Sequence, residues 1–152
     1  MNLNASLLHL LRRASQAADF LFAAQCRDGQ MTARQFAILA AVGANDGAPQ
    51  SVLVEETGID RSTLSEVMNR LDSKGLLTRQ RNASDARAYR VHLTPAGAEA
   101  LAAGSTAAEH VDRQLSEMTG PEEAAELRRL LQIIATSQPE AAPHRLRDPH
   151  TT

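Results

Sequence analysis

The stretch from Ile59 to Thr94 reads IDRSTLSEVMNRLDSKGLLTRQRNASDARAYRVHLT and decides the fold. Asp60 is a favourable N-cap, and apolar residues recur after it at helical spacing. Gly75 can enter the left-handed backbone region that ends a helix. Two β-prone runs follow, Leu76–Arg81 and Ala88–Leu93, with turn-forming residues between them. The stretch therefore predicts a capped helix that leads into a β-hairpin.

A shorter apolar segment just upstream completes a second motif. Ser51–Thr57 is long enough for about two helical turns and ends at Gly58. With the turn that follows, it predicts a helix-turn-helix, in which a short positioning helix precedes a longer reading helix. The outer face of the longer helix combines hydroxyls with Asn69 and Arg70, which suits phosphate and base contacts in a major groove. An ordinary solvated helix face would carry similar residues.

The hairpin carries a local excess of positive charge. Ile59 to Leu93 holds seven basic and four acidic residues, a net charge of +3, in a chain whose formal net charge is −2. Four arginines lie in or beside the two strands, and the turn is expected at Asn82–Arg87. Basic charge concentrated on the elements that would read a groove is what phosphate contact requires.

Three segments carry a resemblance to a known family. Asp85-Ala86-Arg87 follows GLLTRQRN, LTPAG occupies Leu93–Gly97, and MTARQFAILAAV occupies Met31–Val42. Together they resemble the MarR family of bacterial winged-helix regulators over about residues 3–137. The resemblance implies a homodimeric transcription factor that binds a pseudo-palindromic operator in double-stranded DNA. It also implies that Arg87 enters the minor groove and that Asp85 orients it, although a surface ion pair in a turn is the alternative.

The whole chain is expected to be mostly α-helical with a small β-hairpin wing, an α+β winged helix-turn-helix. The DNA-binding lobe is assigned to residues 31–94, and a helical dimerisation region to residues 1–30 and 95–137. Amphipathic helices are expected from Leu3 to Ala24 and after Gly120, where they can pack within one chain or, as the resemblance implies, across two. Residues 138–152 contain three prolines and no apolar period, which predicts a flexible tail.

Candidate site residues fall into two groups. The residues expected to contact DNA are Arg61, Ser62, Thr63, Ser65, Asn69, Arg70, Arg81, Asp85, Arg87 and Arg90. The resemblance also implies an effector pocket formed by the first, second and fifth helices. Arginines beside aromatic residues would suit a small anionic effector, such as a phenolic acid or an acyl thioester. The candidates for this pocket are His9, Arg12, Arg13, Phe20, Phe36 and His110. The alternative is that the phenylalanines belong to the core and the arginines face solvent.

The single cysteine bears on the cellular compartment of the protein and on whether an oxidant, in place of a small effector, could control it. Cys26 has no partner for an internal disulfide, which agrees with a reducing compartment. Charged residues interrupt the apolar N-terminal segment, so no signal peptide or membrane span is expected and the protein should be cytoplasmic. Cys26 could sense oxidants, since Arg27 would lower its pKa, but Asp28 partly cancels that effect. We favour a structural cysteine.

No motif for catalysis, a cofactor or a metal occurs in the sequence. It lacks a glycine-rich phosphate loop, a G-x-S-x-G elbow and a His-Glu-x-x-His motif, and its five histidines do not have ligand spacing. Two function classes remain, a ligand-responsive DNA-binding repressor and a winged-helix module for protein–protein contact. The basic hairpin favours the repressor, because a scaffold has no need for arginines there.

Overall fold

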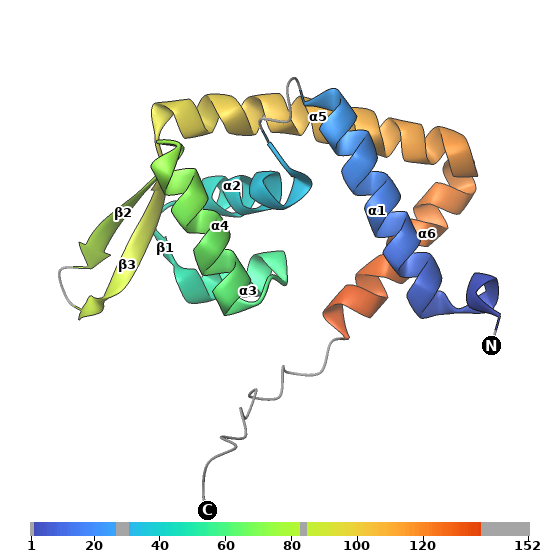
Figure 1. The fold of residues 1–152 in the computed structure, drawn as a ribbon, viewed down its shortest axis with the longest axis horizontal. Helices are drawn as coiled ribbons and strands as arrows, with labels where there is room; N and C mark the ends of the chain where they lie inside the picture. The colour runs from blue at the N-terminus through green and yellow to red at the C-terminus, as the bar shows by residue number, and fades with distance from the viewer. Residues whose placement is uncertain (1, 27–30, 83–84, 138–152) are drawn as a thin grey trace, which may run out of the picture. The chain divides into compact units, whose positions relative to one another are not determined.

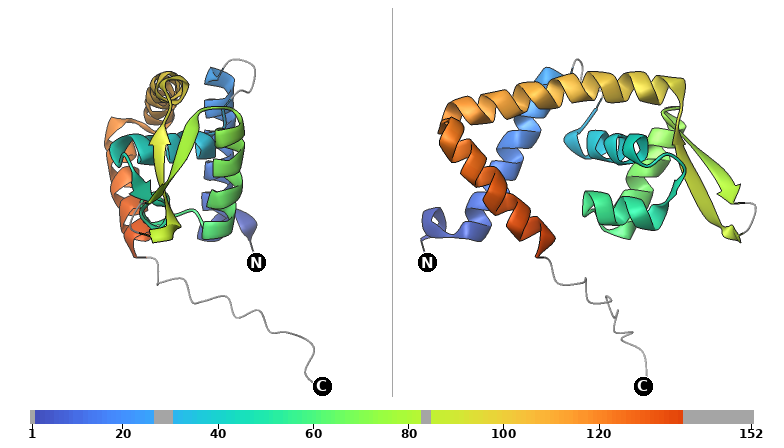
Figure 2. Two further views of the ribbon diagram at one scale, coloured as in Figure 1. Left: turned by 90° about the vertical axis from the view of Figure 1, so that its left-hand side faces the viewer. Right: turned by 180° about the vertical axis from the view of Figure 1, so that it is seen from behind.

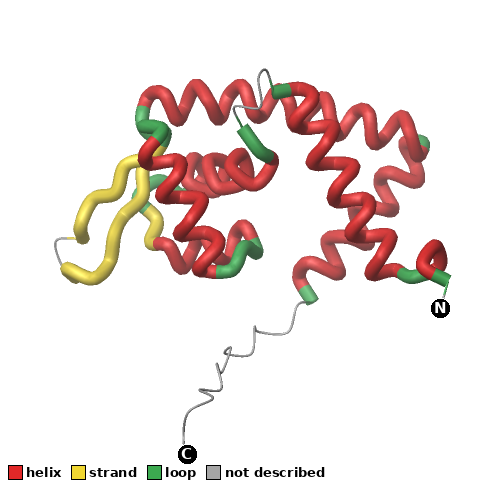
Figure 3. The backbone as a smooth tube through the Cα atoms, in the orientation of Figure 1, coloured by secondary structure: helices red, strands yellow, loops and turns green. Residues whose placement is uncertain are grey.

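The computed structural model describes residues 2–26, 31–82 and 85–137. The described residues up to Gln114 form one compact unit, and those from Leu115 onward form a second. The three strands pair in the order β1-β3-β2, so the chain is mostly helical with a small antiparallel sheet, which confirms the predicted fold class (Figures 1 and 3). The elements are a 3-10 turn Leu3–Ala5, α1 Leu7–Gln25, α2 Ala33–Ala44, β1 Ala48–Pro49, α3 Gln50–Thr57, α4 Arg61–Ser73, β2 Leu77–Asn82, β3 Asp85–Leu93, α5 Pro95–Thr119 and α6 Pro121–Thr136.

The helix starts follow their capping residues. At α2 the Thr32 hydroxyl accepts from the Gln35 N–H at 3.2 Å, and the Gln35 side chain accepts from the Thr32 N–H at 3.1 Å, which is the expected capping box. The prediction that the first helix begins at Leu3 was wrong. Ser6 caps α1 instead, because its hydroxyl accepts from the His9 N–H at 3.4 Å.

The end of α4 has the predicted geometry. Gly75 has a φ of 70°, its N–H donates to the Asp72 carbonyl at 2.8 Å, and the Leu76 N–H donates to the Leu71 carbonyl at 2.9 Å. These two hydrogen bonds are those of a Schellman motif. The left-handed residue reverses the chain, so that β2 begins next to the helix that precedes it.

The wing differs from the prediction near its tip. Asn82–Arg87 was expected to be a turn, but β3 already begins at Asp85 and pairs with Asn82. The register of β2 against β3 shifts between Arg81 and Asn82. The two strands therefore stay paired as far as Asn82 and Asp85, inside the segment that was expected to be a turn. A further strand, β1, was not predicted, because two residues are too short to show an alternating pattern.

The core lies between residues 38 and 91. Its fully buried side chains come from α2, α3, α4 and the two long strands. These helices and strands lie next to one another in both views of Figure 2. Each such aliphatic side chain contributes about 1.5–3 kcal/mol when it is buried. The largest are Ile38, Leu39, Val42, Leu53, Leu64, Met68, Leu71, Leu77 and Val91.

The start of α5 is packed against the root of the wing. The Thr94 N–H donates to the Leu76 carbonyl at 3.1 Å, and the Thr94 hydroxyl donates to the Gly75 carbonyl at 2.6 Å. Gly97 is buried, and a Cβ at this position would overlap the Leu76 carbonyl oxygen. Only glycine allows this approach of the two backbones.

We expect Gly97→Ala to lower the free energy of unfolding by at least about 1–3 kcal/mol, because the added methyl must push α5 away from Leu76. Urea denaturation at fixed protein concentration measures the change. Ala96→Ser, at an exposed position of the same turn, should change the free energy by less than about 0.5 kcal/mol. Equal stability of the two variants would show that the contact at Gly97 is unimportant.

Candidate nucleic-acid interface

The N-terminus of α4 is held by Asp60. Its Oδ1 accepts from the Ser62 hydroxyl at 2.7 Å and from the Thr63 N–H at 3.0 Å. Hydrogen bonds from Ser62 and then Thr63 hold the pKa of Asp60 well below its ordinary value, so this exposed carboxylate is charged at neutral pH. Ser62 and Thr63, both predicted to contact DNA, therefore lie in the first turn of a firmly capped helix.

A glutamine from α3 connects the two helices of the helix-turn-helix. Gln50 Nε2 donates to the Ser65 hydroxyl oxygen and, at 3.4 Å, to the Arg61 carbonyl. The Ser65 hydroxyl in turn donates to the Arg61 carbonyl at 2.9 Å. Ser65 is thus part of the contact between α3 and α4, while Arg61 is exposed. Gln50 was not predicted as a site residue, because no local pattern relates it to a residue 15 positions away.

An arginine from β2 connects the wing to α4. Arg79 Nη2 donates to Asn69 Oδ1 at 2.7 Å, and Arg79 Nε lies 3.8 Å from Asp72 Oδ2. The Arg79 side chain is 26% exposed, which separates it from the surface arginines of the wing. Arg79 was counted only as part of the basic hairpin and was not among the predicted site residues. Its pairing across strand and helix depends on the register of β2 against α4.

Arg70 lies on the flank of α4 that faces α1 and α2. It pairs with Glu66 one turn earlier, and both side chains are 64% exposed, so the pair adds little stability. Arg70 also lines a cavity of about 510 Å³ together with residues of α1 and α2, including Phe20 and Arg34. Asn69 and Arg70 were predicted to read bases together, but they have different surroundings.

The strand register places two of the predicted wing arginines on opposite faces. Arg81 pairs with Tyr89 and Arg90 with Gln80, so Arg81 and Arg90 alternate across the sheet. Both are exposed, and Arg90 Nη1 donates to the Gly47 carbonyl at 3.2 Å. The side chains of the two other predicted wing contacts, Asp85 and Arg87, lie outside the described residues.

Neither of two cavities in the described part of the chain is lined by the six predicted effector residues together. Phe36 packs on Phe22 with ring centroids 5.5 Å apart. Arg12, Arg13 and His110 are exposed and His9 is half-buried, and none of these four lines either described cavity. Phe20 is 75% exposed and lines the cavity beside Arg70.

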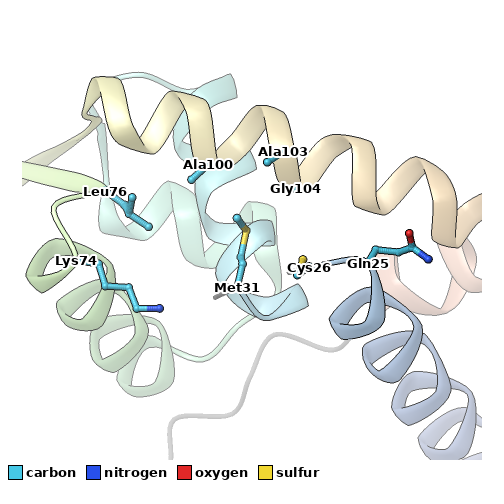
Figure 4. Close-up of a pocket in the computed structure, with 8 residues that line it drawn as sticks. All are labelled: Gln25, Cys26, Met31, Lys74, Leu76, Ala100, Ala103 and Gly104. Atoms are coloured by element: carbon cyan, nitrogen blue, oxygen red, sulfur yellow. The ribbon is translucent and has the colours of Figure 1, made fainter. Parts of the chain in front are cut away.

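A larger cavity of about 620 Å³ lies between the end of α4 and α5 (Figure 4). Among the described residues, Lys74 is the only charged one in its lining, and Figure 4 shows its side chain extending toward Met31. Burial raises the pKa of the Cys26 thiol, which disfavours the reactive thiolate. The lining residues are Gln25, Cys26, Met31, Lys74, Leu76, Ala100, Ala103 and Gly104.

Comparison with known proteins identifies the family. The model of the MarR family matches residues 30–88. The HTH-type transcriptional repressor NicR of Pseudomonas putida is 33% identical over 111 residues, which are 73% of this chain and 68% of NicR. The chain belongs to the MarR family of transcriptional regulators. This confirms the resemblance and the expectation of a regulator family, not an enzyme family.

Other relatives agree with this assignment. A putative transcriptional regulatory protein for the hcr operon of Thauera aromatica is 35% identical over 70% of this chain, and the match spans just under two thirds, 64%, of that relative. The ligand complex of the PcaV regulator of Streptomyces coelicolor superposes with a TM-score of 0.83 at 28% identity, covering 90% of this chain and 96% of PcaV. BpsR of Bordetella bronchiseptica is a protein whose binding to DNA is regulated by 6-hydroxynicotinic acid. It superposes with a TM-score of 0.76 at 30% identity, covering 84% of this chain and 96% of BpsR.

Within residues 2–26, 31–82 and 85–137, no helix is long and apolar enough to cross a membrane. In the same residues, no group of three or more His, Cys, Asp or Glu side chains could hold a metal ion.

Proposed function

We propose that the protein is a homodimeric DNA-binding repressor that leaves a pseudo-palindromic operator when it binds a small effector. The observation that carries the proposal is the capped helix α4, fixed to the arginine-bearing wing through Arg79. A helix held in this way can enter a major groove while the wing follows the backbone. BpsR, a relative of similar structure, binds DNA under the control of an aromatic carboxylic acid.

The proposed roles of the side chains differ with their positions on α4 and the wing. Arg61 and the exposed wing arginines, Arg81 and Arg90, would bind phosphates, and Asn69 would face base edges. Arg87 would enter the minor groove and Asp85 would orient it. Lobe residues 31–94 would bind DNA, and residues 1–30 and 95–137 would form the dimer.

Exposed apolar side chains support a dimer. Leu7 and Leu8 of α1 are 78% and 71% exposed. Neighbouring exposed apolar side chains of this kind mark a protein–protein contact surface. In the second compact unit, α6 carries its own row of exposed residues, Leu127, Leu130, Leu131, Ile133 and Ile134. A second copy of the chain would cover both surfaces. A two-fold dimer would also place two reading helices about one DNA turn apart, some ~34–36 Å.

The cavity beside Lys74 is our candidate effector site, in place of the residues predicted from the sequence. Its lining is largely apolar with one cationic side chain, which suits a phenolic acid or the acyl part of a thioester. Lys74 is also the C-cap of α4, so an effector there would contact the reading helix directly. The raised pKa of Cys26 argues against oxidant sensing as the trigger.

DNA binding can be tested with the DNA upstream of the protein's own gene in an electrophoretic shift assay. Arg87→Ala should weaken binding and reduce the slope of log K against log salt by about 0.9 for each phosphate that the variant no longer neutralises. Asp85→Ala should weaken binding less, because it removes only the orienting partner. Arg128→Ala on α6 is the control and should leave both quantities unchanged. Tighter binding by Asp85→Ala, together with near wild-type affinity of Arg87→Ala, would reject the minor-groove role. Absence of any shift would favour the protein-interaction alternative.

The dimer can be tested by sedimentation velocity at micromolar concentration. Leu8→Glu should produce monomer, since it places a charge in the apolar surface of α1. Gln16→Glu adds the same charge at an exposed polar position and should remain dimeric. A folded monomer of the wild-type chain would contradict the two-fold arrangement.

The effector site can be tested by thermal shift with phenolic acids and their thioesters. A compound at about 100 times its Kd should stabilise the protein by about 2.7 kcal/mol. Lys74→Gln should remove this effect, and Arg113→Gln should not. Lys74 is the only lysine of the chain, so a bound effector should also slow its modification by an amine reagent. Unchanged stabilisation in Lys74→Gln would place the effector elsewhere.

A further inference from the structure

Arg79 is placed to fix the orientation of Asn69, which lies exposed on α4. The guanidinium donates from Nη2 to Asn69 Oδ1 at 2.7 Å. On its other side, Arg79 Nε lies 3.8 Å from Asp72 Oδ2, so a second residue of α4 restrains the same side chain. Arg79 itself is mostly buried between strand and helix. This is the arrangement of a support behind a reading residue, and not of a free phosphate contact.

The chemistry of the two groups allows only one orientation of the amide. A guanidinium has five N–H donors and no acceptor, so the amide corner that faces it must be the oxygen. The other corner of the planar amide then carries Nδ2, which has two hydrogens to donate. Asn69 therefore offers its donor outward, while its acceptor is engaged toward the wing.

Base pairs differ in what they offer such a donor. Guanine presents O6 and N7 as acceptors in the major groove, and thymine presents O4. Adenine is normally read by an asparagine that donates to N7 and accepts from the N6 amino group, which requires Oδ1 to lie beside the base, whereas here Oδ1 is turned toward Arg79. Cytosine presents an amino donor, which Nδ2 cannot use.

We propose that Arg79 is a positioning residue that makes Asn69 a donor-only reader, selective for guanine or thymine and against adenine. This inference rests on the proposed DNA-binding function. It assigns base preference to a residue that need not touch DNA. It also explains why the half-buried arginine of β2 has both Asn69 and Asp72 as partners.

The test begins with the full-length wild-type protein and a duplex pool with a randomised centre. Selection gives a consensus, and Asn69→Ala identifies the position whose preference depends on Asn69. At that position the wild type should prefer guanine or thymine over adenine by roughly 5- to 150-fold. If the selected pair is T·A, its adenine can be replaced by purine, which lacks the amino group. This replacement should change the affinity of the wild type by no more than about twofold beyond the change that it causes in Asn69→Ala.

Arg79→Met then removes the donors and keeps much of the side-chain volume. It should free Asn69 Oδ1 and lower the preference against adenine at that one position several-fold. Arg79→Lys retains a donor and should restore the wild-type preference at least in part. Arg81→Met removes an exposed arginine of the same strand and should weaken binding to all four sequences alike.

Several results would overturn the proposal. These are a wild-type preference for adenine, a large loss of affinity with purine, no position that depends on Asn69, or an unchanged base ranking in folded Arg79→Met. Thermal melting shows whether Arg79→Met is folded, and the wild-type ranking decides the matter if it is not. Failure of the wild type to select any consensus would instead reject the proposed DNA-binding function.

Discussion

The backbone of Leu76 is the point on which the packing of α4, the wing and α5 depends. Its N–H ends α4 by donating to Leu71, and its carbonyl accepts from Thr94, which precedes α5. Gly97 then lies so close that a side chain there would overlap this carbonyl. One residue thus joins the end of α4, the root of the wing and the start of α5. The angle between helix and wing follows from this junction, because both leave it within a few residues.

The polar side chains of the candidate interface are largely bonded to one another before any DNA is present. Gln50 holds Ser65, Asp60 holds Ser62, and Arg79 holds Asn69. Each of these bonds restricts rotamers that would otherwise lose entropy on binding. Arg70 differs, because its partner Glu66 is equally exposed and can be exchanged for a phosphate at little cost. The interface therefore combines side chains of α4 that are fixed by hydrogen bonds with an adaptable one near α1 and α2.

Local sequence signals predicted those parts of the fold that depend on neighbouring residues. The cap at Asp60, the capping box at Thr32 and the stop at Gly75 involve groups at most a few positions apart, and all three were predicted correctly. The start of β3 was missed because Asp85 pairs with Asn82 within a run of turn-forming residues. β1 was missed because it exists only through pairing with the distant β3. The same reason explains why Gln50 and Arg79 were not recognised as parts of the site. Chemistry suggested which side chains could meet DNA, but only strand register shows that Arg81 and Arg90 occupy opposite faces.

An effector can change DNA affinity only if it binds the DNA-bound and free conformations with different affinities. An effector in the cavity beside Lys74 would act through its walls, because one belongs to the end of α4 and another to α5. The Leu76 junction, which also lines the cavity, connects these walls. A ligand that forces the walls apart must strain the Leu76–Thr94 hydrogen bond and with it the angle of α4. The coupling would then run through a single packed junction, and a tenfold loss of DNA affinity would require a difference in effector binding of only about 1.4 kcal/mol.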